Sequence, residues 1–217
     1  MNTVNIVANN IEDAWFQCLN KVLTTGYEYA IARGSFVGHK RRELDFVTIE
    51  IRNPGQRPLA PITPEGVSPP TSDEYIAEYL TYLMTSERQE NEQYTYGEDL
   101  EPQMFKVIDM YKHHPDTNQA CMTIGSKDSI DLDDPPCLRI LDTRLRYGKL
   151  HFIVYFRSWD LWAAFPTNLG GLQLMKEFMA SEIGCEDGEI IATSKGLHLY
   201  DYSWSLAGQV CRLENDK

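Results

Sequence analysis

Apolar and polar residues alternate in the stretch LDFVTIEI at residues 44–51, just before the turn-forming sequence Asn53-Pro54-Gly55. A period of two is typical of a β-strand that buries one face. By contrast, the apolar residues of Ile11–Thr25 recur at helical spacing, with Asn9 or Asn10 as candidate N-cap and Gly26 as candidate end. Helical and strand patterns are mixed along the chain without strict alternation. The pattern alone therefore predicts an α+β fold.

The same reasoning predicts the remaining elements. Further helices are predicted from residue 73, with Ser72 or Thr71 as cap, and over 100–112 and 169–183. Strands are predicted at 120–124, 138–141, 150–156 and 189–193, with a hairpin turn over 146–149. Residues 57–70 hold five prolines and are predicted to be a loop. No pattern assigns residues 204–213.

The chain has 217 residues, enough for one domain with a full hydrophobic core, and a formal net charge of −12. This charge argues against a general binder of nucleic acid or of an anionic membrane surface, because both need clustered cations. No apolar run approaches the roughly 20 residues of a membrane span, and the N-terminus lacks the features of a signal peptide. We therefore expect a cytoplasmic protein.

The cysteine pattern points the same way. There are five cysteines and no CxxC pair, which argues against a disulfide framework and against a zinc site. Free thiols in a reducing compartment are the expectation. Cys137 differs from the others because Pro135 and Pro136 fix the backbone before it, at the start of a predicted strand. A positioned nucleophilic thiol and a structural cysteine both fit this local sequence.

Three other segments offer polar groups that suit a small anionic ligand. Arg157-Ser158 follows a predicted strand and suits a phosphate, although a salt bridge of Arg157 explains it equally well. Asn168 either caps the helix that follows, as Thr167 also does, or reads an amide-like ligand. His198 and Tyr200 share one face of an extended segment, as ligand contacts or as satisfied core groups.

Taken in order, these motifs resemble the thymidylate synthase family, which includes the pyrimidine nucleotide hydroxymethylases. The match runs from PPC at Cys137 to RSWD twenty residues on, then FPTN at Asn168 and HLY at Tyr200. Glu78 in EYL and Tyr96 in YTYG also fit. The resemblance covers roughly residues 73–202 and is greatest to the compact archaeal or phage branch. It implies a three-layer arrangement around a curved, mostly antiparallel sheet, as one catalytic domain over residues 1–217.

The resemblance also implies an activity. The family adds a one-carbon unit to C5 of a pyrimidine nucleotide after a cysteine thiolate has attacked C6. Cys137 falls on this nucleophile, and Arg157 and Ser158 fall on phosphate ligands. Asn168 falls on the residue that distinguishes uracil from cytosine, which favours dUMP as substrate and dTMP as product. His198 and Tyr200 fall on the pair that binds the deoxyribose hydroxyl.

The remaining family positions concern proton transfer and the second substrate. Glu78 falls on a proton-relaying glutamate, Tyr96 on a tyrosine of the proton-abstraction network, and Asp160 on an aspartate at the pyrimidine and folate edge. An N-terminal arginine also meets the phosphate, and Arg41 and Arg42 are both candidates. The implied one-carbon donor is methylene-tetrahydrofolate or a modified reduced pterin, without a metal, and the implied assembly is a homodimer packed through the sheet.

The sequence also departs from the family pattern. Asn118 and Gln119 stand where relatives place two arginines that reach the partner's phosphate. Residues 87–93 contain no tryptophan to flank the folate, and 17 residues follow Tyr200, too few for a long closing tail. Two alternatives to dTMP synthesis therefore stay open. One is hydroxymethylation of a deoxypyrimidine nucleotide, and the other is nucleotide binding without catalysis.

Overall fold

The computed structural model describes residues 1–33, 36–87 and 94–213. Within these residues, the larger of two β-sheets has six strands. They are β1 (Thr3–Ala8), β4 (Phe46–Ile51), β9 (Glu186–Ser194), β7 (Lys149–Phe156), β6 (Leu138–Arg146) and β5 (Cys121–Thr123), in their order across the sheet. The pairs β1–β4 and β7–β9 are parallel, and the other neighbours are antiparallel.

The smaller sheet carries four strands in the same described residues. They are β2 (Tyr27–Ala30), β3 (Lys40–Leu44), β10 (Leu197–Tyr200) and β8 (Trp159–Asp160), again in spatial order. Here β10–β8 is parallel and the other two pairs are antiparallel. The predicted α+β class is confirmed, and the strands are divided between two mixed sheets.

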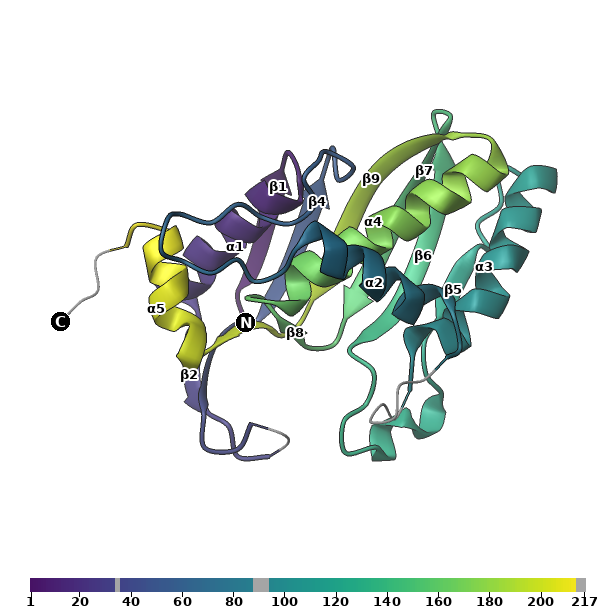
Figure 1. The fold of residues 1–217 in the computed structure, drawn as a ribbon. Coiled ribbons are helices and arrows are strands. Elements are labelled where there is room, and N and C mark those ends of the chain that lie inside the picture. Colours follow the sequence, from purple (N-terminus) through teal and green to yellow (C-terminus); the bar gives the residue numbers. More distant parts are fainter. Residues whose placement is uncertain (34–35, 88–93, 214–217) are drawn as a thin grey trace.

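Five α-helices accompany the two sheets in the described residues. They are α1 (Ile11–Thr25), α2 (Asp73–Met84), α3 (Tyr96–His113), α4 (Ala164–Ile183) and α5 (Asp201–Val210), with a 3₁₀ turn η1 (Lys127–Asp131). α4 runs across β7 and β9, and α2 packs against α4 (Figure 1). None of the helices in the described ranges has the length and apolar character needed to cross a membrane.

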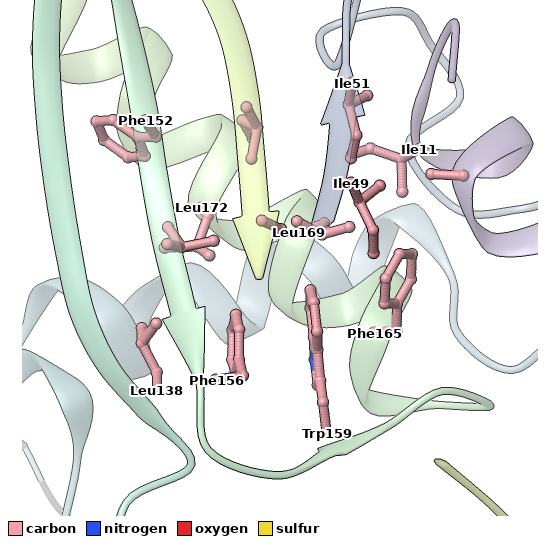
Figure 2. Close-up of a cluster of buried hydrophobic side chains, with 14 of the residues drawn as sticks. Ile11, Ile49, Ile51, Leu138, Phe152, Phe156, Trp159, Phe165, Leu169 and Leu172 are labelled. Atoms are coloured by element: carbon pink, nitrogen blue, oxygen red, sulfur yellow. The ribbon is translucent and has the colours of Figure 1, made fainter. Parts of the chain in front are cut away.

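The hydrophobic core lies between α4 and the sheet. Leu172 of α4 lies toward Phe152 of β7, Leu169 lies toward Ile49 of β4, and Trp159 lies between Phe156 and Phe165 (Figure 2). Each of these side chains is at most 1% exposed, and full burial of one such side chain is worth about 1.5–3 kcal/mol. A core of this kind gives the polar residues at its edge a rigid support.

Several sequence predictions are confirmed. α1 has the predicted bounds, and its N-cap Asn10 accepts a hydrogen bond from the Asp13 backbone N–H at 2.9 Å. In β4 the residues Val47, Ile49 and Ile51 are buried and the alternate ones are half-exposed, as the alternation predicts. Residues 57–70 form no helix or strand.

The predicted starts of two helices are wrong. α4 begins at Ala164 rather than at residue 169, because the first turn of a helix tolerates Pro166. α3 begins at Tyr96 rather than at residue 100, because Thr95 and Glu98 form a capping box. Asn168 is therefore inside a helix and does not cap it. The sequence patterns also missed β1, β2, β3, β8 and α5.

The hairpin of β6 and β7 is confirmed and longer than predicted. Its turn residues Tyr147 and Gly148 both have positive φ, 54° and 73°, which matches the right-handed twist of the strands. Leu138 pairs with Phe156 at the open end of the hairpin. The register therefore places Cys137 beside Arg157, and the Arg157 backbone N–H donates to the Cys137 carbonyl at 2.8 Å.

One charged side chain is fully buried far from this hairpin end. Lys176 of α4 is 0% exposed, donates to the Gly188 carbonyl, and lies 3.2 Å from the Asp187 carboxylate. Burial disfavours the ammonium ion and lowers the pKa of Lys176 to about 8, against opposing effects of Asp187, Glu177 and Glu189.

A Lys176→Met variant tests this burial. The native pKa of about 8 lies below the ordinary value of 10.5, so the unfolded chain binds more protons between these pH values. We expect the free energy of unfolding of the wild type, relative to the variant, to rise by on the order of 2 kcal/mol from about pH 7.5 to about pH 10. Urea denaturation across this range measures it, and parallel profiles for the two proteins would contradict it.

Candidate active site

A cavity of about 500 Å³ collects most of the residues that the sequence singles out. Its lining comes from the smaller sheet, from the segments just before β6 and just after β7, and from the starts of α3 and α4. The predicted residues that line it are Cys137, Tyr96, Asp160, Arg157, Ser158, Asn168, His198, Tyr200 and Arg41. Segments that are far apart in the chain thus converge on one hollow.

Cys137 lies directly before β6 on the cavity wall. The Leu138 backbone N–H after it donates to the Tyr96 hydroxyl at 3.3 Å, which ties the cysteine to the start of α3. Burial raises the pKa of the Cys137 thiol, the guanidinium groups of Arg157 and Arg41 act against this, and Asp134 adds to it. The thiol is therefore mainly protonated at neutral pH.

Arg157 is held by the loop that precedes the cysteine. Its Nε donates to the carbonyls of Pro135 and Pro136 at 3.2 and 3.1 Å, and its Nη2 donates to the Asp134 carboxylate at 3.3 Å and to the Pro135 carbonyl. The salt bridge that the sequence left open is therefore present, with Asp134. The same guanidinium also lines the cavity next to Ser158.

Asp160 supports the first turn of α4. Its carboxylate accepts hydrogen bonds from the backbone N–H groups of Trp162, Ala163 and Ala164, at 3.2 to 3.4 Å. These N–H groups have no partner inside the helix, and a negative charge at a helix N-terminus is favourable. Burial nevertheless raises the pKa of Asp160 above its ordinary value. The carboxylate thus joins the cavity wall to the helix that carries Asn168.

Asn168 has both ends of its amide engaged. Its Oδ1 accepts from the Trp159 indole N–H at 2.9 Å, and its Nδ2 donates to the Tyr79 hydroxyl at 2.7 Å. The N-cap alternative for Asn168 and Thr167 is wrong, since the N-cap of α4 is Ala163 and Thr167 donates to its carbonyl at 2.9 Å.

His198 and Tyr200 of β10 face the cavity together. The His198 Nδ1 lies 2.8 Å from the Gly196 carbonyl, whereas its Nε2 is buried without a hydrogen-bond partner in the described residues. Burial lowers the pKa of His198 to about 3, with a further lowering by Arg41. The ring is therefore neutral, with Nδ1–H donating and Nε2 ready to accept from a ligand. A fully satisfied core histidine does not match this geometry.

The two candidate arginines of β3 point in opposite directions, as neighbours in a strand do. Arg41 donates to the Tyr200 hydroxyl at 2.7 Å, and its buried Nε has no partner among the described residues. Arg42 lies 4.4 Å from the Trp204 ring centre and pairs with Glu28 at 3.3 Å. Only Arg41 of the pair lines the cavity.

Glu78 opens onto a second hollow, of about 420 Å³, rather than onto the main cavity. Tyr75, Tyr79 and Tyr82 line this hollow with it, and Tyr96 lines both hollows. Tyr79 and Tyr82 are stacked with 5.5 Å between ring centres. The tryptophan-free stretch 87–93 lies outside the described residues except for Glu87, which also lines the second hollow.

Some lining residues were not identified from the sequence. Arg33 and Phe36 line the main cavity from the segment between β2 and β3, and Phe36 packs on Tyr200 with 4.4 Å between ring centres. The sequence signal that could have identified this segment is Arg33, an arginine next to a glycine in a polar stretch. Asn118 and Gln119 are exposed and do not line the cavity. Among the described residues, no group of three or more His, Cys, Asp or Glu side chains is arranged to hold a metal ion.

Comparison with known proteins agrees with this geometry. The family described as "Thymidylate synthase" matches residues 81–215. A protein of Methanosarcina acetivorans described as "Putative thymidylate synthase" is 30% identical over 214 residues, which cover 95% of this chain and 94% of that protein. A "Deoxyuridylate hydroxymethyltransferase" of Bacillus phage SP01 is 39% identical over 103 residues, 45% of this chain and 27% of the phage protein.

A "Thymidylate synthase" of Listeria monocytogenes is 31% identical over 106 residues, which cover 48% of this chain and 33% of that protein. The family match, the nearly full-length archaeal relative and the convergence of the motif residues on one cavity lead to one conclusion. The chain belongs to the thymidylate synthase family.

Proposed function

We propose that this protein transfers a one-carbon unit to C5 of dUMP and releases dTMP, through a covalent adduct between Cys137 and C6. The observation that carries the proposal is the single cavity shared by Cys137, Asn168 and His198 with the cations Arg41 and Arg157. A nucleophile, a base-reading amide, a hydroxyl acceptor and phosphate-binding groups are what a pyrimidine nucleotide needs. Residues 1–217 act in this proposal as one catalytic domain.

The first chemical step depends on the thiol. The Cys137 sulfur, as thiolate, forms a bond to C6, and the C5=C6 π electrons move toward O4 as an enolate. An N–H of the Asn168 amide donates to O4 and stabilises this developing charge. C5 is then the nucleophilic carbon. At the end the S–C6 bond breaks and its electron pair returns to sulfur.

Proton transfer falls to Tyr96 and Glu78, which line the second hollow. Tyr96 lines both hollows, and burial raises its pKa well above its ordinary value. Its hydroxyl is therefore neutral and already accepts from the Leu138 N–H, so it can relay a proton from C5 toward Glu78. General acid–base help of this kind is typically worth 10²–10⁴-fold.

The second hollow fits the flat ring of a reduced folate or pterin. Its aromatic walls, Tyr75, Tyr79 and Tyr82, suit stacking, and the carboxylates of Glu78 and Glu87 suit ring N–H groups. Such a group supplies the one-carbon unit and, for methylation, the hydride. These side chains would hold the folate or pterin beside Tyr96, next to the main cavity in which the nucleotide would bind.

Two further parts of the proposal concern assembly and product. Ile140 and Ile153 are 38% and 36% exposed on the face of the larger sheet opposite α4, which suits a homodimer packed through the sheet. Hydroxymethylation of dUMP is the second candidate, because the phage relative carries the name "Deoxyuridylate hydroxymethyltransferase".

Incubation with 5-fluoro-dUMP and methylene-tetrahydrofolate tests the activity. We expect a covalent complex on the Cys137 peptide by mass spectrometry, release of tritium from [5-³H]dUMP, and neither with Cys137→Ala. The product mass separates a methyl from a hydroxymethyl group. Binding of dUMP without tritium release or adduct, with methylene-tetrahydrofolate and with reduced pterins, would contradict the proposal and favour a non-catalytic nucleotide binder.

Matched variants of the β3 arginines test phosphate binding. Arg41→Gln removes a cavity cation, whereas Arg42→Gln removes one that packs on Trp204 outside it. We expect the dissociation constant of dUMP to rise about tenfold or more, ~1.4 kcal/mol, for Arg41→Gln and by less than about twofold for Arg42→Gln. Calorimetric titration with dUMP and with deoxyuridine, which lacks the phosphate, measures both. Equal effects of the two variants would count against the assignment.

The reactivity of Cys137 tests its electrostatic environment. Because Arg157 opposes the effect of burial on the thiol pKa, Arg157→Gln should shift the pH midpoint of Cys137 alkylation upward and slow the reaction several-fold at about pH 8. Peptide mass spectrometry after iodoacetamide treatment gives the rate for each thiol, with exposed Cys121 as internal reference. Arg146→Gln, which loses an ion pair with Asp116 outside the cavity, is the control. An unshifted midpoint would refute this assignment.

A further inference from the structure

The amide of Asn168 is held from two sides by Trp159 of the RSWD motif and Tyr79 of the EYL motif, two side chains to which the sequence analysis assigns no role. The Trp159 indole N–H donates to Oδ1 at 2.9 Å, and the Tyr79 hydroxyl accepts from Nδ2 at 2.7 Å. Trp159 belongs to β8 and Tyr79 to α2. Two separate elements thus converge on one amide group of α4.

The Trp159 contact fixes which end of the amide is which, and the Tyr79 contact holds the other end. An indole N–H is only a donor, so it must face the amide oxygen of Asn168. A half-turn of the amide would place the NH₂ group against the Trp159 N–H, donor against donor, and leave both without a partner. Only one of the two amide orientations is therefore compatible with Trp159.

Trp159 is itself immobile. It is 1% exposed, stacks on Phe156 with 3.9 Å between ring centres, and packs on Phe165 at 4.5 Å (Figure 2). Tyr79 is stacked on Tyr82. Neither ring can turn away to accept the other amide orientation without disrupting its aromatic neighbours.

The amide keeps one acceptor site and one donor after these bonds. Its oxygen has a second lone pair and its NH₂ group has a second hydrogen. Asn168 lines the main cavity. Uracil presents an N3–H donor beside the O4 acceptor, whereas cytosine presents the N3 acceptor beside an amino donor. An amide that turns freely can pair with either edge, but an amide held in one orientation can pair with only one.

We propose that Trp159 and Tyr79 are positioning residues that lock the Asn168 amide and thereby set the choice between uracil and cytosine nucleotides. The choice of uracil rests on the proposed function, whereas the lock itself does not. Selectivity arises here from three side chains, of which only Asn168 touches the base. Asn168 alone, without its two partners, carries the hydrogen-bonding groups for both bases.

The experiment compares dUMP with dCMP in the full-length protein. The ratio of kcat/KM for the two nucleotides comes from tritium release at C5, and the ratio of dissociation constants comes from calorimetric titration. The variants are Trp159→Phe, which removes the indole donor, and Tyr79→Phe, which removes only a hydroxyl. Trp162→Phe is the matched control, because Trp162 is a buried tryptophan that packs on Trp15.

We expect the wild type to prefer dUMP, and the preference to fall about tenfold or more in Trp159→Phe and several-fold in Tyr79→Phe, with the ratio unchanged in Trp162→Phe. Tyr79→Phe preserves the ring packing and keeps the test decisive if Trp159→Phe does not fold. Loss of rate with an unchanged ratio in both variants would overturn the lock.

Other outcomes separate the lock from the proposed function. A wild type that prefers dCMP, with a preference that shrinks in the variants, would support the lock and overturn dUMP as substrate. Selective dUMP binding that weakens in the variants, without tritium release, would support the lock and overturn the catalytic proposal. Binding of neither nucleotide would overturn both.

Discussion

The close approach of α2 to α4 is the contact on which the site depends. A Cβ atom on Gly170 would lie 2.8 Å from the Ile76 side chain, and one on Gly171 would lie 2.8 Å from the Tyr79 ring and 2.9 Å from Leu83. These distances are too short for a side chain, so only glycine lets the two helices pack at this separation. The paired glycines directly follow Asn168 and Leu169, and this packing brings the Tyr79 hydroxyl to the Asn168 amide.

The second constraint is the shortage of positive charge. Because the net charge is −12, the proposed dianionic substrate would have to be held by a few local cations. Arg41 offers a buried Nε without a described partner, and Arg33 lines the same cavity. Asn118 and Gln119 lie outside the cavity. The local arrangement of β3, rather than the overall charge, therefore decides whether a phosphate can bind.

Sequence patterns predicted the elements that neighbouring residues along the chain determine. The alternation in β4 and the Asn10 cap of α1 depend only on neighbouring residues, and both were confirmed. The start of α4 was missed because Pro-Thr-Asn resembles the residues just before a helix, whereas Asp160 supplies the capping carboxylate from outside the helix. Motif order brought Cys137 and His198 to one cavity, but the choice of Arg41 over Arg42 needed the register of β3 against β10. Trp159 and Tyr79 stand in the RSWD and EYL motifs, but their contacts with Asn168 depend on how β8, α2 and α4 pack in the fold, which the motifs do not show.

Arg157 connects the proposed phosphate site to the nucleophile. Its guanidinium holds the carbonyls of Pro135 and Pro136, the residues directly before Cys137, and also meets Asp134. A phosphate that binds here competes with the Asp134 carboxylate for the same donors. Displacement of Asp134 removes a charge that raises the pKa of Cys137, whereas the phosphate introduces another charge farther along the nucleotide. Coulomb energy falls with distance. Replacement of the Asp134 carboxylate by the phosphate therefore favours the thiolate if the carboxylate lies nearer to the Cys137 sulfur than the phosphate does. Asp134 thus contacts the guanidinium of the proposed phosphate site and also raises the pKa of the Cys137 thiol.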